Sequence, residues 1–203
     1  MMASTASKQT RTNGERGQAL LEMLPIMVLM LTLAFAVVDF GRAIWQQEVI
    51  TGLTREGSNV ASRTTGVDLP TALAAGVTAV INDGAPLNLG GSCPHCGAVI
   101  ITAVQNTVLP SGVQAYVMIG QAHGGNLFGG NPTGMSKIGA YVSGGTNIAT
   151  LSAESLPGVT VQIPQPGSTV YVTEVFDSYA PITPIASFMR ITLPANLYDA
   201  AYF

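Results

Sequence analysis

Charged side chains are scarce in this sequence. Of its 203 residues, 8 are Lys or Arg and 11 are Asp or Glu, so charged residues make up 9 % of the chain against 47 % hydrophobic ones. Soluble domains ordinarily carry about 25 % charged residues, so a membrane segment or an extended partner surface must account for the difference. The net charge of −3 provides no basic surface, and we predict no nucleic-acid partner.

Motifs that carry catalysis or bind cofactors are also missing from the sequence. It contains no Gly-x-Ser-x-Gly elbow, no P-loop, and no Gly-x-Gly-x-x-Gly after a predicted strand. Glu174 and Asp177 lie in a predicted strand, where we interpret them as part of a solvated face. The two histidines and two cysteines lack the spacing of a structural zinc site. We therefore predict a protein without catalytic residues, metal or cofactor.

The only two cysteines stand close together in Cys93-Pro-His-Cys96. In thiol oxidoreductases such a pair opens a helix whose N-terminus lowers the pKa of the first cysteine. Here the pair lies in a predicted loop before a strand. In an oxidising compartment two cysteines this close should pair, so a structural Cys93–Cys96 disulfide is the favoured interpretation. Metal binding with His95 or His123, and redox catalysis, remain as alternatives.

One long hydrophobic run stands out near the N-terminus. Residues 19–38 contain a single charged residue, Glu22, and basic residues at Lys8, Arg11 and Arg16 precede the run. About 20 apolar residues span the roughly 30 Å hydrocarbon core of a bilayer, and flanking basic residues stay on the cytoplasmic side. The run is longer than the core of a secretory signal peptide. We predict a single-pass helix with a cytoplasmic N-terminus and an exported C-terminal region.

Glu22 distinguishes this helix from a plain membrane anchor, which is the alternative. A carboxylate inside an apolar helix is costly and usually has a partner. Glu22 is the fifth residue counted from Gln18, and Gln18 follows Gly17 and a short basic leader. This arrangement has the form of a type IV prepilin site. Cleavage between Gly17 and Gln18 would expose an amine that can neutralise Glu22 of a neighbouring subunit on assembly.

The helix should continue beyond the membrane. Small or apolar residues and one Gln recur three and four residues apart, which marks one helical face, at Ala43, Gln46, Ile50, Leu53, Gly57 and Val60. A helix over residues 18–63 would be roughly 70 Å long at 1.5 Å per residue. Pro25 should kink it near its start. Its second half should form a spine under the exported domain, with Trp45 near the membrane edge.

These segments resemble the N-terminal module of TadE-like proteins, minor pilins or pseudopilins of the Tad (tight adherence) pilus. The resemblance rests on residues 16–22 and on two linked motifs, Asp39-Phe40-Gly41-Arg42 and Arg55-Glu56-Gly57. It implies a prepilin peptidase that cuts after Gly17. It also implies partners in the membrane, among other pilin subunits and in the Tad secretion machinery, with the protein in the bacterial cytoplasmic membrane or an extracellular pilus. Met23 departs from the family, where an aromatic residue is common at that position.

For the exported part, residues 64–203, the sequence predicts a domain that contains both helix and strand. A second helix over residues 68–82, capped by Asp68, should pack its apolar face on the first helix. Runs rich in β-branched and aromatic residues predict strands at 99–104, 114–119, 159–163 and 169–179. A Gly- and Asn-rich insertion occupies about residues 120–155. The fold class expected is α+β and type IV pilin-like, with a long helix packed on a short helix and an antiparallel sheet.

The end of the sequence also resembles TadE-like proteins, in which a strand ends in a Tyr-x-Pro-hydrophobic-Thr-Pro turn, as at residues 179–184. The resemblance implies that a last strand follows this turn, at residues 191–193. The favoured function is a structural pilin-like subunit in a Tad pilus used for surface attachment. One alternative is a membrane-anchored envelope binding module that forms no filament and binds its partner through the insertion. The other is a thiol-disulfide oxidoreductase that uses Cys93 and Cys96.

Overall fold

The computed structural model describes residues 13–64, 66–87, 89–90, 95–109, 111–127, 132–145, 147–149, 151, 165–183 and 196–203. The chain forms two compact units, one of residues 1–41 with 181–191, the other of residues 42–180 with 192–203. Residues 1–12 of the predicted leader, Cys93, and the strands predicted at 159–163 and 191–193 lie outside the described residues.

Helix α1 (Asn13–Arg63) begins in the first unit and ends in the second. It confirms the long apolar N-terminal helix, and it includes Pro25. In the first unit, residues 20–38 are mostly exposed and highly apolar, and they are called the apolar segment below. In the second unit the predicted face is confirmed, because all six of its residues are buried or half-buried.

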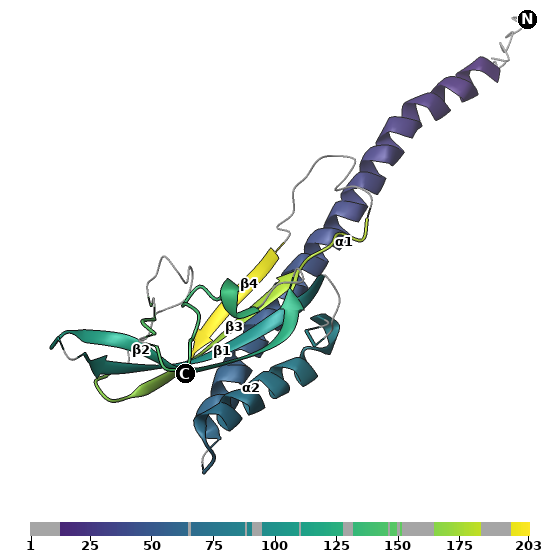
Figure 1. The fold of residues 1–203 in the computed structure, drawn as a ribbon. Coiled ribbons are helices and arrows are strands. Elements are labelled where there is room, and N and C mark those ends of the chain that lie inside the picture. The colour runs from purple at the N-terminus through teal and green to yellow at the C-terminus, as the bar shows by residue number, and fades with distance from the viewer. Residues whose placement is uncertain are drawn as a thin grey trace, which may run out of the picture. The chain divides into compact units, whose positions relative to one another are not determined.

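Helix α2 (Leu69–Asp83) packs against the second half of α1 (Figure 1). Its apolar face meets α1 in one core, which contains Ile50, Leu53, Ala61, Leu73, Val77 and Val80. Two glycines permit close approach of the helices. A Cβ placed on Gly76 would lie 3.0 Å from the carbonyl oxygen of Gly57. The amide of Gly84 ends α2 by donating to the carbonyl of Val80 at 2.8 Å.

Four antiparallel strands form one sheet in the order β2-β1-β3-β4. The strands are β1 (His95–Val108), β2 (Gln114–Leu127), β3 (Thr169–Ser178) and β4 (Asn196–Tyr202). In the central pairing, Ile101 lies opposite Thr173 of β3 and Ala122 of β2. Two short 3₁₀ helices, η1 (Ala85–Leu87) and η2 (Pro132–Met135), complete the described elements. The α+β class is confirmed.

Both faces of the sheet are covered. Residues such as Val99, Ile101 and Val175 share the core of α1 and α2. On the opposite face, Ile100, Val104 and Val172 pack under η2 and the chain that follows it. The apolar residues on that side are Met135, Ile138, Tyr141, Ala149 and Leu151. The strand β2 continues to Leu127, into the segment predicted as an insertion, and residues 132–151 act as a cover on the sheet.

Candidate functional site on the first helix

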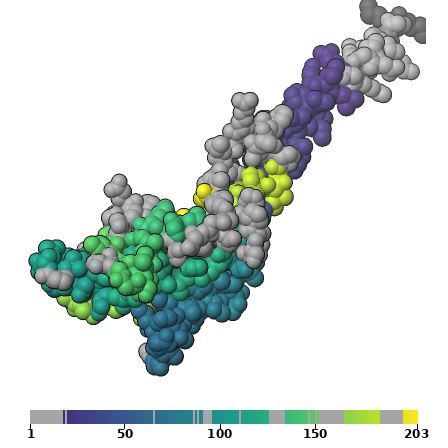
Figure 2. All heavy atoms as spheres, in the orientation of Figure 1, coloured from purple at the N-terminus to yellow at the C-terminus, as the bar shows by residue number. Residues whose placement is uncertain are grey.

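The apolar segment is long and apolar enough to cross a membrane. An 18-residue stretch of α1 has a mean hydropathy of 2.4 and none of it is buried within the protein. In Figure 2, the purple residues of α1 form a bare rod along the face shown. Gly17 and Gln18 lie in the first turns of this helix, and the Gln18 side chain donates to Glu22 at 3.2 Å. Cleavage at Gly17 and an assembly role for Glu22 stay predictions.

Asp39 binds a turn that is distant in sequence, within the first unit. Its side chain is 1 % exposed. One carboxylate oxygen accepts hydrogen bonds from the backbone amides of Ile182, at 3.1 Å, and Thr183, at 3.3 Å, and the other accepts from the hydroxyl of Thr183. Asp39, the first residue of the Asp39-Phe40-Gly41-Arg42 motif, therefore holds the turn at residues 181–183.

Arg42 makes a matching contact within the second unit. Its guanidinium donates to the carbonyl of Ala180 at 3.5 Å. Asp177 lies nearby: burial raises its pKa to about 6, while a backbone hydrogen bond at Ser178 and the positive charge of Arg42 act in the opposite direction. Asp39 thus binds residues 182 and 183 in the first unit, and Arg42 binds residue 180 in the second unit.

The Arg55-Glu56-Gly57 motif divides into a buried glycine and two exposed charges. A Cβ on Gly57 would lie 2.6 Å from Val80 Cγ2 and 2.9 Å from Thr173 Cγ2, so the glycine allows α1 to approach α2 and β3 together. Arg55 and Glu56 are exposed. Glycine is therefore needed for packing, while the two charges are available to a partner.

A polar pair on α1, which sequence reasoning missed, fixes the helix to the sheet. The hydroxyl of Thr54 donates to Asp199 of β4 at 3.3 Å. The hydroxyl of Ser58 lies 2.9 Å from that of Thr173 and 3.0 Å from the carbonyl of Ala201. The signal that could have revealed them is their spacing of four residues, adjacent to the apolar face of α1.

The interpretation of Glu174 and Asp177 as a solvated face is wrong. Glu174 is 0 % exposed and Asp177 is 3 % exposed. Burial raises the pKa of Glu174, while hydrogen bonds oppose the shift. Its carboxylate accepts from the hydroxyl of Ser136, from the amide of Lys137 at 2.9 Å and from the hydroxyl of Tyr198 at 3.0 Å. Glu174 therefore joins the cover to the sheet.

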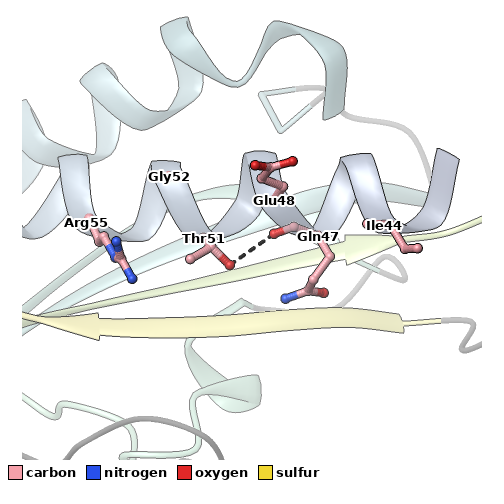
Figure 3. Close-up of a pocket in the computed structure, with 6 residues that line it drawn as sticks. All are labelled: Ile44, Gln47, Glu48, Thr51, Gly52 and Arg55. Atoms are coloured by element: carbon pink, nitrogen blue, oxygen red, sulfur yellow. Dashed lines mark hydrogen bonds between the residues drawn. The ribbon is translucent and has the colours of Figure 1, made fainter. Parts of the chain in front are cut away.

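An open groove follows the exposed side of α1 in the second unit. It has a volume of about 740 Å³ and is lined by Ile44, Gln47, Glu48, Thr51, Gly52 and Arg55. Figure 3 shows these residues on successive turns of the helix, with the Gln47 side chain directed toward a strand of the sheet. Its amide donates to the carbonyl of Tyr198 in β4 at 3.5 Å. Ile44 is 67 % exposed, so the groove is partly apolar.

The structure describes some of the residues predicted to form a disulfide or to bind metal. Cys96 is 1 % exposed at the start of β1, and Cys93 lies outside the described residues, so their pairing stays a prediction. His123 lies exposed on β2. Among the residues that the structure describes, no group of three or more His, Cys, Asp or Glu side chains could hold a metal ion.

Comparison with known proteins identifies one family. Residues 17–59 match the family model described as TadE-like protein. That stretch covers the predicted processing site at Gly17 and Gln18, the apolar segment and both helix motifs, from Asp39 to Gly57. The comparisons with curated proteins and with solved structures gave no match. Over its first helix, the chain is similar to TadE-like proteins.

Proposed function

We propose that this TadE-like protein is a structural pilin-like subunit, a minor pilin or pseudopilin, in assembly of a Tad pilus for surface attachment. The family match supports the link to the pilus. The finer role rests on a single observation. In α1, one helix carries both an uncovered apolar segment and the buried spine of a folded unit.

The uncovered segment needs an apolar environment. Exposing some twenty apolar side chains to water is strongly unfavourable, at about 25 cal/mol for each Å² of apolar surface. A bilayer removes this cost while the subunit waits in the membrane, and helices of other subunits can remove it in a filament. Both environments suit a helix, because its backbone hydrogen bonds are satisfied internally.

Processing would prepare the same helix for assembly. A prepilin peptidase would cut between Gly17 and Gln18, leaving the apolar segment next to a new amine. The amine of one copy would neutralise Glu22 of another, which gives this carboxylate a partner in the apolar interior. The leader would lie in the cytoplasm and the folded unit outside the cytoplasmic membrane, where Cys93 and Cys96 would form a stiffening disulfide.

The buried carboxylates support a structural role. Asp39 and Glu174 each accept hydrogen bonds from three protein groups, and both connect segments distant in sequence. Carboxylates engaged in this way position backbone, and they are poorly placed to exchange protons with a substrate.

Intact mass of the chain from its native membrane tests this proposal. We expect loss of residues 1–17 in cells with an active prepilin peptidase, and the full mass in cells without it. A Gly17→Leu variant should keep its leader in both strains, while Glu22→Gln should be cut but should fail to enter filaments. An uncut wild-type chain in the presence of the peptidase would instead support a plain anchored binding module. Under non-reducing conditions the mass should also be lower by the two hydrogens lost on disulfide formation.

A further inference from the structure

The two edge strands of the sheet, β2 and β4, differ in how far the chain protects them. Along β2, Ala149 donates its backbone amide to the carbonyl of Tyr116 at 2.7 Å, and Met118 donates to the carbonyl of Asn147 at 2.7 Å. The pairing of β2 with β1 also contains two register shifts. Covering chain and bulges are common ways of protecting an edge strand from further pairing. The β2 edge has both.

The β4 edge has neither protection. Its pairing with β3 contains no register shift, its sequence contains no Pro or Lys, and among the described strands only β3 pairs with it. Tyr171 and Phe203 exchange both backbone hydrogen bonds at 2.9 Å. Because bonded pairs alternate along antiparallel strands, the backbone groups of Tyr198, Ala200 and Tyr202 point away from β3. These outward groups are called the open edge below.

Helix α1 borders the open edge. The Gln47 side chain donates to the carbonyl of Tyr198 at 3.5 Å, a long hydrogen bond at a position where a neighbouring strand would supply a backbone amide. Thr51 and Arg55 follow Gln47 at steps of about 40° around the helix, so the three side chains form one row. Figure 3 shows them directed to one side of α1. The row and Ile44 line the groove of about 740 Å³, which therefore adjoins the open edge.

We propose that the open edge binds an extended segment of a partner protein, which adds a strand antiparallel to β4 and lies in the groove beside α1. The backbone groups of the open edge would hold the segment, and every second side chain of the segment would face α1. From Ile44 to Arg55 the helix rises about 16 Å, which is the length of about five strand residues. The inference goes beyond the proposed function, because it needs only the second unit.

The direction of the segment follows from the contacts of α1 with β4. Gln47 contacts Tyr198, and Ser58 further along α1 contacts Ala201, so the helix and the strand run in the same general direction. An antiparallel segment therefore enters the groove at the end formed by Arg55. Arg55 is exposed and, within the described part of the chain, forms no salt bridge or side-chain hydrogen bond. A carboxylate near the start of the segment would satisfy it.

The other end of the groove has the opposite charge and an apolar side chain. Ile44 is 67 % exposed there, beside the exposed Glu48. An apolar residue of the segment would cover Ile44, whereas Glu48 would repel an acidic one. Side chains on one face of a strand are separated by even numbers of residues. The segment should therefore carry an acidic residue first and an apolar residue four positions later.

A second copy of this chain fits the open edge less well than a separate segment. In each copy Leu197 already packs in the core with α1, and Asp199 already accepts from Thr54. Two β4 strands could pair through their backbones, but the side chains on this face would stay with their own helix and leave the groove empty. A segment without a helix on that face fills the groove and the open edge together.

A synthetic peptide, Thr-Glu-Thr-Val-Thr-Ile-Thr, is the probe for the full-length chain in detergent micelles. Its Glu and Ile have the required order and spacing. We expect the peptide to slow amide exchange at Ala200 and Tyr202, which point toward it, with little change at Asp199 and Ala201, which already bond to β3. Equal slowing at all four amides would refute strand addition, and so would slowing in β2 alone. A peptide with Pro in place of Val should not bind.

A charge exchange tests the orientation of the segment. Arg55→Glu should weaken binding of the peptide about tenfold, and should prefer a peptide with Lys in place of Glu. The matched control Glu56→Arg, an exposed position about 100° around the helix from Arg55, should bind like the wild type. Ala200→Pro should abolish binding, because it removes an outward amide and leaves the ladder to β3 complete. Should Ala200→Pro fail to fold, the charge exchange decides the question alone.

Three results would overturn the proposal. The wild type would bind no peptide, or Arg55→Glu would keep the preference for the acidic peptide. In the third, exchange at Ala200 and Tyr202 would slow as the concentration of the chain rises without peptide, which would identify a second copy as the occupant.

Discussion

Asp39 should hold the turn at residues 181–183, and its removal should release that turn. In Asp39→Ala, the amides of Ile182 and Thr183 lose their acceptor. A hydrogen bond to a charged group contributes about 1.5–3 kcal/mol. The low end applies, because Ile182 is 65 % exposed and a freed amide reaches water. Loss of both amide bonds should weaken the turn by about 3 kcal/mol, a factor of roughly 150 in its opening equilibrium.

Hydrogen–deuterium exchange of the full chain in detergent micelles measures this opening directly. We expect exchange at Ile182 and Thr183 to accelerate by up to about 150-fold in Asp39→Ala, and by less in Asp39→Asn, which retains one acceptor oxygen. Asp68→Ala is the matched control, because the exposed Asp68 accepts only from the hydroxyl of Thr71 at 2.7 Å. Unchanged protection of Ile182 and Thr183 in Asp39→Ala would refute the assigned role of Asp39.

Three further predictions concern the second unit, and the first two are measured as the unfolding free energy of the full chain in micelles. Gly57→Ala should lower this free energy by about 1–3 kcal/mol, because the added methyl group overpacks against the stiff side chains of Val80 and Thr173. Gly52→Ala has open space around it and should leave the free energy unchanged or raise it by up to about 1 kcal/mol, so equal effects of the two variants would contradict the packing argument. Burial raises the pKa of Asp177 to about 6 and raises that of Glu174, so the folded chain holds more protons than the unfolded chain from about pH 4 upward, and stability should fall as pH rises through these folded pKa values. Asp177→Asn should flatten this decline between about pH 4 and 6, and an unaltered profile would show that Asp177 does not cause it. Glu174→Gln should abolish the acceptor of the Lys137 amide or of Ser136, and residues 136–138 should then exchange deuterium faster, while protection in β1 stays as it was.

The helices were predictable from the sequence because their apolar residues recur three and four positions apart over many turns. The apolar face from Ala43 to Val60 and the capping of the second helix by Asp68 both gave strong patterns, and the structure has α1 and α2 at those positions. The strand β4 was missed for a physical reason. Its sequence, Asn-Leu-Tyr-Asp-Ala-Ala-Tyr, has no β-branched residue, so pairing with β3 and packing on α1 determine its conformation.

The candidate site was predictable in its members but not in its geometry. Both family blocks were visible in the sequence, yet nothing in it showed that Asp39 binds the turn at Thr183. The error at Glu174 and Asp177 arose from the assumption that one face of β3 is exposed to solvent. The cover at residues 132–151 closes that face, and a Gly- and Asn-rich composition gave no sign of it. Long-range burial of this kind depends on tertiary packing, which local patterns do not record.

The hydrogen bond from Ser58 to the carbonyl of Ala201 joins residues 143 positions apart, and the one from Thr54 to Asp199 joins residues 145 apart. The ribosome makes α1 first, so the hydroxyls of Thr54 and Ser58 can reach their partners on β4 only after β4 has been synthesised. Contacts of such high sequence separation form late and slow the folding of a domain. A chain interrupted before β4 would leave these hydroxyls without their partners on that strand and the apolar residues beside them uncovered. The fold of α1 in the second unit is thus completed by the strand that is synthesised last of the described elements.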